Sequence, residues 1–127
     1  MIQLSQGLID MIAAPSIAPG GQAIDLEHLS KMTLGERSLE REVLALFDQQ
    51  STMLTRRMRG AAPAVIAASA HTLKGSARGI GAWRVARAAE AVEQAAGNAA
   101  GLKLAVAQLS ASVSEAKAAI VDLLRTH

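Results

Sequence analysis

The residues of this chain best suited to chemistry are a histidine, a lysine one helical turn later and a glycine beside that lysine. They are His71, Lys74 and Gly75, and they stand in an alanine-rich stretch between Pro63 and Gly81. An imidazole is a nucleophile near neutral pH, and an ammonium group stabilises negative charge on whatever that nucleophile carries. A glycine leaves room for a close approach. These residue types at this spacing predict a docking and reaction site for an anionic group.

Helical periodicity indicates that the imidazole points toward solvent. At about 100° per residue in an α-helix, the large apolar side chains fall on the side away from His71. That side carries Ile66, Leu73, Ala77 and Ile80. The side of His71 carries only small side chains and two cations, namely Ala64, Ala67, Ala68, Lys74, Gly75 and Arg78. We therefore expect a buried Ile/Leu stripe and an exposed imidazole within a surface that a partner can contact.

Gly75 and Lys74 each favour this interpretation. A helical side chain leans toward the N-terminus, so a large residue at position 75 would cover His71. Glycine inside a helix costs about 1 kcal/mol relative to alanine, which indicates that access matters here. Lys74 is expected to offset the nearly two negative charges of a phosphoryl group on the histidine nitrogen.

This stretch resembles the signature of the histidine phosphotransfer (HPt) domain family. The signature reads His-x-Leu-Lys-Gly-Ser-[Ala/Ser], and the matching residues are His71, Leu73, Lys74, Gly75, Ser76 and Ala77, followed by Gly81. Weaker similarity runs from about Ile24 to the C-terminus, through residues 24–29, 43–47 and 89–93, and leaves residues 1–23 outside. The resemblance implies a phosphorelay, in which His71 accepts a phosphoryl group from an aspartate of one receiver domain and returns it to another.

The resemblance also implies the partners and the supply of metal. The expected partners are response-regulator receiver domains and a hybrid histidine kinase. The receiver domain would provide the acidic pocket and the Mg²⁺, so this chain itself needs no cofactor. Because it has no nucleotide-binding motif, we expect a phosphocarrier and not an autonomous catalyst.

Glu93 has two interpretations. The resemblance places its helix beside His71, where the carboxylate would accept a hydrogen bond from Nδ1–H and leave Nε2 free to react. Alternatively, Glu93 is a surface glutamate paired with Arg87 or Lys103. Ser76 lies about 140° around the helix from His71, which is poor geometry for direct activation as a nucleophile.

Composition and turn residues predict an all-α fold. Half of the residues are hydrophobic and 2% are aromatic, which suits closely packed helices better than sheets. Proline and glycine positions predict helices over about 2–13, 25–33, 36–59, 63–80, 82–96 and 101–125. Short connections make the last four an antiparallel up-down four-helix bundle. The bundle domain is assigned to residues 24–127 and an N-terminal extension with a Pro/Gly linker to residues 1–23. On the 36–59 helix we expect the buried side to carry Leu39, Val43, Leu46, Phe47, Leu54 and Met58.

Charge and cysteine content argue against several other classes of protein. The net charge is +2 and there is no cysteine, so the chain has neither a disulfide framework nor a thiolate metal site. Arg56, Arg57 and Arg59 form one basic cluster, which we interpret as a solvated helix end since it is small and lacks stacking aromatic residues. No apolar run suggests a membrane span, and no Lys or Arg precedes Lys31, whereas a signal peptide would have a basic N-terminal region. We expect a cytoplasmic monomer that binds neither nucleic acid nor membrane.

Two other functions remain open. The first is a non-catalytic helical binding module that keeps the HPt fold without the relay. The second is a phosphoacceptor domain excised from a histidine kinase. Dimerising acceptor regions usually carry an acid directly after the histidine, whereas Thr72 follows His71 here. The phosphoacceptor domain of a chemotaxis kinase is a closer version of this alternative.

Overall fold

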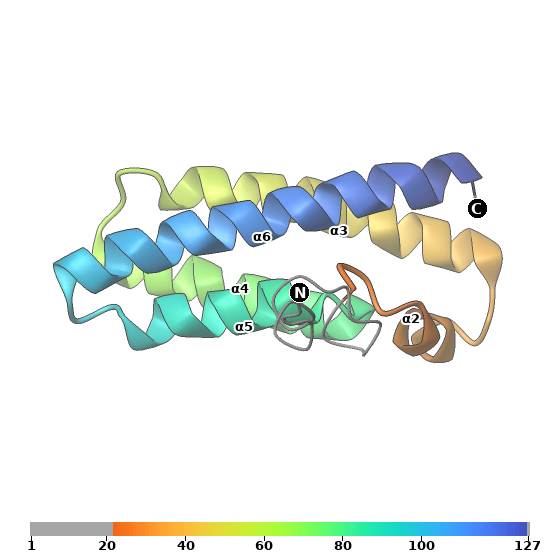
Figure 1. Ribbon diagram of the computed structural model, residues 1–127, viewed down its shortest axis with the longest axis horizontal. Coiled ribbons are helices and arrows are strands. Elements are labelled where there is room, and N and C mark those ends of the chain that lie inside the picture. Colours follow the sequence, from red (N-terminus) through yellow and green to blue (C-terminus); the bar gives the residue numbers. More distant parts are fainter. Residues whose placement is uncertain (1–21, 127) are drawn as a thin grey trace, which may run out of the picture.

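The computed structural model describes residues 22–126, which form five helices and no strand (Figure 1). The helices are α2 (Leu26–Met32), α3 (Arg37–Met58), α4 (Pro63–Ile80), α5 (Trp83–Gln94) and α6 (Ala99–Thr126). The all-α prediction is confirmed, and each of these helices begins and ends within two residues of its predicted bounds. The helix predicted over 2–13 and the linker before residue 22 lie outside the described residues.

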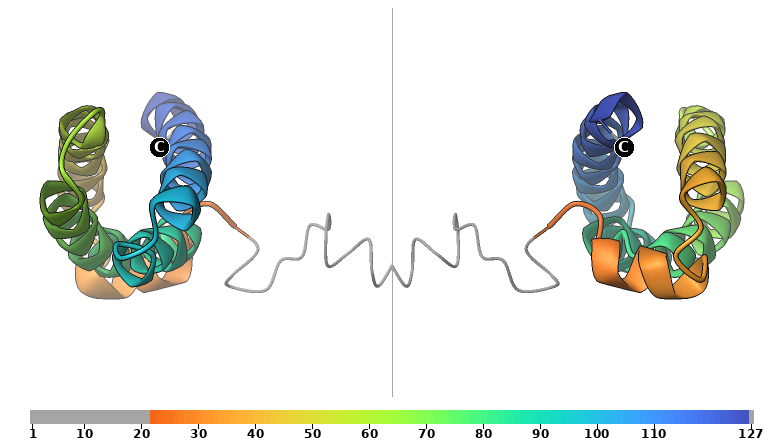
Figure 2. Two further views of the ribbon diagram at one scale, coloured as in Figure 1. Left: turned by 90° about the vertical axis from the view of Figure 1, so that its left-hand side faces the viewer. Right: turned by 90° about the vertical axis from the view of Figure 1, so that its right-hand side faces the viewer.

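The four long helices, α3 to α6, form the up-down bundle. α4 contacts α3 and α5, α5 contacts α6, and α6 in turn contacts α3. The end-on views of Figure 2 show these helices side by side around a shared interior, with α2 across one end. Fully buried side chains from all four helices fill that interior, among them Leu44, Leu73, Val92, Leu109 and Ile120. The bundle therefore holds α4, the helix of His71, between two neighbours along its length.

Local sequence accounts for the helix ends around the bundle. Asp25 caps α2, because its Oδ1 accepts a hydrogen bond from the backbone N–H of His28 at 3.1 Å. Pro63 occupies the first turn of α4, where its missing N–H costs nothing. Gly81 ends α4 in the left-handed conformation with φ 81°, which favours glycine. These signals were all present in the sequence.

The buried face of α3 differs from the predicted one. Phe47, Leu54 and Met58 are buried as predicted, whereas Leu39 is 37% exposed and Leu46 is 56% exposed. Two polar residues, Glu40 and Ser51, are buried in their place, and the Thr33 hydroxyl lies 3.3 Å from the Glu40 carboxylate. The prediction was wrong for the two leucines because Glu40, Leu44, Phe47, Ser51, Leu54 and Met58 recur at alternate steps of four and three and make the better stripe.

Trp83 and Asp25 attach α2 to the bundle. The indole Nε1–H of Trp83 donates to Asp25 Oδ2 at 2.8 Å, and the Trp83 ring meets the His28 ring edge-on at 4.8 Å between centroids. The backbone N–H of Asp25 donates to the Gly81 carbonyl at 2.9 Å. The same carboxylate thus caps α2 and contacts the start of α5.

α6 is the one helix among the described residues that is long and apolar enough to cross a membrane by length and composition, with a mean hydropathy of 1.2 over an 18-residue window. The expectation of no such run was therefore wrong for this helix. In the bundle, Leu102, Leu109, Val113 and Ile120 on α6 are buried against the other helices. Packing in the core accounts for this stripe of larger apolar residues.

Candidate functional site

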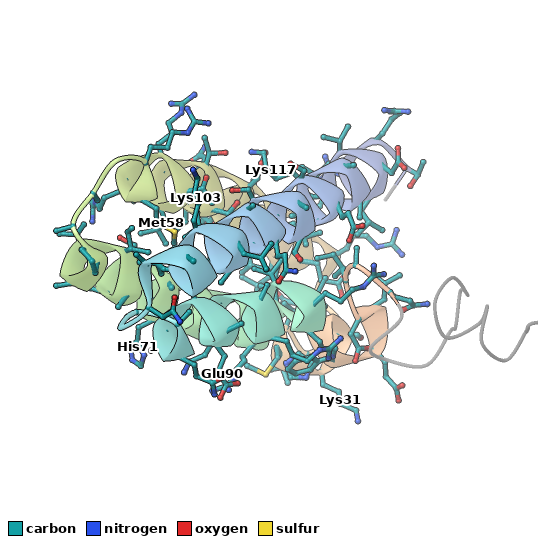
Figure 3. The ribbon with its side chains drawn as sticks, turned by 60° about the vertical axis from the view of Figure 1, so that its left-hand side comes forward. Lys31, Met58, His71, Glu90, Lys103 and Lys117 are labelled. Atoms are coloured by element: carbon teal, nitrogen blue, oxygen red, sulfur yellow. The ribbon has the colours of Figure 1, made fainter. Side chains whose placement is uncertain are left out.

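His71 projects from the middle of α4 into solvent. Its side chain is 69% exposed, while Ile66, Leu73, Ala77 and Ile80 on the opposite side of α4 are buried. This confirms the orientation that helical periodicity predicts. Figure 3 shows His71 pointing away from the bundle, on the same side as Glu90 of α5.

A carboxylate from α5 reaches the imidazole. Glu93 Oε2 lies 2.8 Å from His71 Nδ1, and Glu93 Oε1 lies 2.7 Å from Lys74 Nζ. Glu93 therefore pairs with two residues of α4 and not with Arg87 or Lys103. The close packing of α4 against α5 brings together residues 22 positions apart in the sequence.

The electrostatics of this group determine the tautomer of His71. The hydrogen bond from Lys74 is the main cause that lowers the pKa of Glu93 below its ordinary value, with a smaller contribution from His71 and with partial burial acting against both. Glu93 is therefore ionised at neutral pH and can only accept hydrogen bonds. The proton of a neutral imidazole must then lie on Nδ1, and Nε2 keeps its lone pair.

The two cations expected around His71 are less available than the sequence suggested. The Lys74 side chain is only 16% exposed and is held by Glu93. Arg78 is 54% exposed, and its Nη2 lies 3.7 Å from Glu90 Oε1. Lys74 thus acts on His71 through Glu93 in this structure, a contact that no spacing within α4 could indicate.

The surface around the imidazole is otherwise small and open. Ala64 and Ala68 are exposed, and Ala67 is partly buried. A Cβ added at Gly75 would meet no atom within 4 Å outside its own helix. Glycine is therefore not required here by packing against another helix, which leaves access to His71 as a reason for its presence.

A comparison with models of protein families gave a match. The family model of the Hpt domain matches residues 25–125. The chain belongs to the Hpt domain family. This confirms the predicted family, whose members carry out phosphotransfer in phosphorelays. Neither the curated proteins nor the solved structures gave a match.

The Hpt domain also has an apolar surface beside His71 that the sequence reasoning missed. Two adjoining grooves of about 430 and 400 Å³ run between α3 and α4 and share Gln50. Exposed apolar side chains line them, with Leu46 at 56%, Met53 at 50% and Val65 at 42% exposure. The signal was the recurrence of Leu39, Leu46 and Met53 at every seventh position, which marks a second apolar side of α3.

The remaining side chains near the site have other roles or none. Ser76 lines the first groove on the α3 side of α4, away from the Glu93 contact. Within residues 22–126, no group of three or more His, Cys, Asp and Glu side chains is arranged to hold a metal ion.

Proposed function

We propose that this Hpt domain relays a phosphoryl group between receiver-domain aspartates through Nε2 of His71. The observation that carries the proposal is the 2.8 Å contact between Nδ1 of this exposed imidazole and Glu93. It holds the ring in one orientation and directs the unprotonated nitrogen toward solvent, where a partner can reach it.

The transfer step follows from this arrangement. The lone pair of Nε2 attacks the phosphorus of an aspartyl phosphate on the receiver. A P–N bond forms, the P–O bond to the aspartate breaks, and the aspartate leaves as a free carboxylate. The imidazole keeps its proton on Nδ1 and becomes positively charged, which the Glu93 carboxylate stabilises. The reverse step returns the phosphoryl group to another receiver.

Lys74 has two parts in this proposal. It keeps Glu93 ionised and in place through the 2.7 Å ion pair. Its charge also offsets the added negative charge of the phosphoryl group. Arg78, held more loosely by Glu90, would supply a further cation at the edge of the contact. The receiver domain would supply the Mg²⁺.

The receiver would dock over the small residues of α4 and the neighbouring grooves. Ala64, Ala68 and Gly75 leave the imidazole accessible, and Ala67 lies partly buried beside them. The apolar side chains Leu46, Met53 and Val65 extend this surface toward α3, whereas charged residues flank His71 on the α5 side. Apolar contact at the centre with charge at the rim is typical of transient protein interfaces.

The wider assignment is part of the same proposal. We place the relay domain at residues 24–127, with residues 1–23 as an extension, and we expect a cytoplasmic monomer that receives its phosphoryl group from a hybrid histidine kinase. A non-catalytic module or an excised kinase phosphoacceptor domain remains the alternative. The orientation of Nε2 of His71 toward solvent favours a domain that accepts a phosphoryl group over a non-catalytic module.

Phosphoryl transfer from labelled receiver domains tests the proposal. The chain should acquire one phosphoryl group that is labile in acid and stable in base, and a second receiver should remove it. His71→Gln should abolish labelling and leave helical content and melting nearly unchanged, since the side chain is exposed. Continued labelling of His71→Gln at another residue would refute the assignment. Labelling by the ATP-binding domain of a kinase and not by a receiver domain would favour a kinase acceptor domain.

A further inference from the structure

Another concave surface, apart from the two grooves beside His71, lies between α3 and α6. It has a volume of about 250 Å³ and is formed by one face of each helix. Lys117 of α6 lines it, and Figure 3 shows Lys117 on the side of the bundle away from His71. The lining is mixed, because Val106 and Val113 contribute apolar surface. Its cations and hydroxyl groups belong to Thr52, Thr55, Arg56, Arg59, Ser110, Ser114 and Lys117. It is separate from the grooves beside His71.

The charges in this concave surface are unbalanced. Arg56, Arg59 and Lys117 line it, and Asp48 is the carboxylate paired there, with its Oδ1 2.5 Å from Lys117 Nζ. Within the described residues neither arginine has an ion-pair partner. Two arginines without an ion-pair partner therefore line the same concave surface, which favours an anion.

The hydroxyl groups differ in what they can still bind. Thr52 and Thr55 donate to backbone carbonyls of α3, and Thr52 also accepts from Lys117. Ser110 and Ser114 of α6 have no hydrogen-bond partner among the described residues, so both can donate to a ligand. Donors thus come from both helices.

The end of α3 explains only part of this arrangement. Arginines at the C-terminal end of a helix interact favourably with the helix dipole, and that accounts for Arg56 in the last turn of α3 and Arg59 at its C-cap. It does not account for Lys117, which lies well within α6, or for the two serines opposite the arginines. The ion pair with Asp48 accounts for Lys117, whereas nothing in the fold accounts for the two serines whose hydroxyl groups lie opposite the arginines.

We propose that the concave surface between α3 and α6 binds a phosphate-type oxyanion, either inorganic phosphate or the phosphoryl group of a small phosphomonoester. Arginine forks match phosphate oxygens in paired hydrogen bonds, and a lysine adds a point charge. The volume of about 250 Å³ exceeds that of a single phosphate group and leaves room for the body of a small phosphomonoester. This site does not depend on the relay function, because it involves neither His71 nor Glu93.

Titration of the full chain with inorganic phosphate, followed by amide chemical shifts at constant ionic strength, tests the proposal. We expect saturable shifts confined to residues 52–59 and 110–117, and competition by sulfate. A second titration with glycerol phosphate distinguishes the two sources. If glycerol phosphate binds more tightly than inorganic phosphate, the ligand is a phosphomonoester, and if it binds more weakly, the ligand is inorganic phosphate. His71→Gln should bind phosphate as the unaltered chain does.

Matched arginine variants separate a site from general charge attraction. Arg56→Ala and Arg59→Ala should each weaken phosphate binding about tenfold, because a charge-assisted hydrogen bond is lost. Arg57→Ala removes the same charge from the same helix, but this side chain lines the groove toward α4, so affinity should be unchanged. Equal losses in all three variants, or shifts that chloride reproduces, would overturn the proposal.

Discussion

Glu93 gives His71 a defined tautomer, and this contact is the most informative one in the site at the scale of residues. Its two oxygens bind Nδ1 of His71 and Nζ of Lys74 at 2.8 and 2.7 Å. A carboxylate held in this way orients the ring before reaction and stabilises the positive charge that develops in it. Glu93 is therefore a positioning residue in the proposed relay.

Replacement of Glu93 by glutamine tests this role. The amide keeps the shape but loses the charge, so we expect transfer to slow about tenfold, since a charge-assisted hydrogen bond is about twice as strong as a neutral one. Imidazole nitrogen chemical shifts should show a mixture of tautomers in Glu93→Gln. Glu90→Gln is the matched control, because Glu90 contacts Arg78 and not the imidazole. A single unchanged tautomer with normal transfer would contradict the role.

The sequence could predict the part of the site that lies within one helix. The spacing of His71, Lys74 and Gly75 determines their common side of α4, and that orientation is confirmed for the exposed imidazole. The Glu93 contact depends on how α5 packs against α4, so the residues alone left two interpretations open. Lys74 was likewise expected to be exposed, because its ion pair is with a residue of α5 and nothing in its own helix indicates it.

At the scale of elements, two glycines of α4 have opposite structural roles. Gly75 is helical, and an added Cβ meets open space. Gly81 has φ 81°, and a Cβ there would lie 2.9 Å from the Asp25 carbonyl oxygen. The first glycine is replaceable for folding, and the second is required by the turn to α5 and by the close approach of the chain before α2.

Alanine at each position should reveal this difference. Gly75→Ala should raise the free energy of unfolding by about 0.5–1 kcal/mol, because alanine is the better helix former. Gly81→Ala should lower it by about 1–3 kcal/mol through backbone strain, with the Asp25 contact adding to the loss. Urea denaturation measures both. Destabilisation by Gly75→Ala would mean that α4 has no free space there.

Gly75→Leu should fold and yet impair transfer, since it would cover His71.

The surface shared by α3 and α4 makes a second prediction at this scale. Ala68→Arg should leave the bundle folded and weaken receiver binding and transfer at least tenfold, because the bulk lies beside His71 and at the groove. Ala107→Arg adds the same side chain to an exposed position of α6 and should have little effect. Chemical-shift mapping with a cognate receiver checks the location. Shifts centred on α6 would show that the docking surface is elsewhere.

The error on α3 shows why helix faces are harder to predict than helix bounds. Leu39 and Leu46 follow a heptad spacing and look like core residues, while Glu40 and Ser51 look exposed. The structure buries the polar pair and gives Glu40 a partner in Thr33, which belongs to the segment after α2. When one helix has two apolar sides, the packing of the neighbouring helices determines which side is buried.

For the molecule as a whole, two carboxylates link the fold to pH. The Trp83 hydrogen bond is the main cause that lowers the pKa of Asp25, and the Lys74 hydrogen bond is the main cause for Glu93. Since both pKa values lie below those of the unfolded chain, the unfolded chain binds more protons in acid. Their contribution to stability is complete above the ordinary values of 3.8 and 4.5, and it is lost as pH falls through the folded-state values.

Glu93→Gln should therefore flatten the acid side of the stability curve. The variant lacks one of the two groups whose protonation favours unfolding. The difference in free energy of unfolding between the variant and the unaltered chain should therefore be largest near neutral pH and shrink in acid. Urea unfolding across the acid range measures this. A constant difference at every pH would show that the Glu93 ion pair makes no contribution to the pH dependence.

Asp25 can be followed separately because Trp83 is the only tryptophan of the chain and donates directly to its carboxylate. Protonation of Asp25 in acid weakens that hydrogen bond, so the emission of Trp83 should change before the bundle unfolds. Asp25→Asn should abolish the change, whereas Glu93→Gln should retain it. His28 also contacts the Trp83 ring, and repeating the titration in His28→Gln removes its contribution. An emission change that persists in Asp25→Asn would mean that the attachment of α2 does not depend on the charge of this carboxylate.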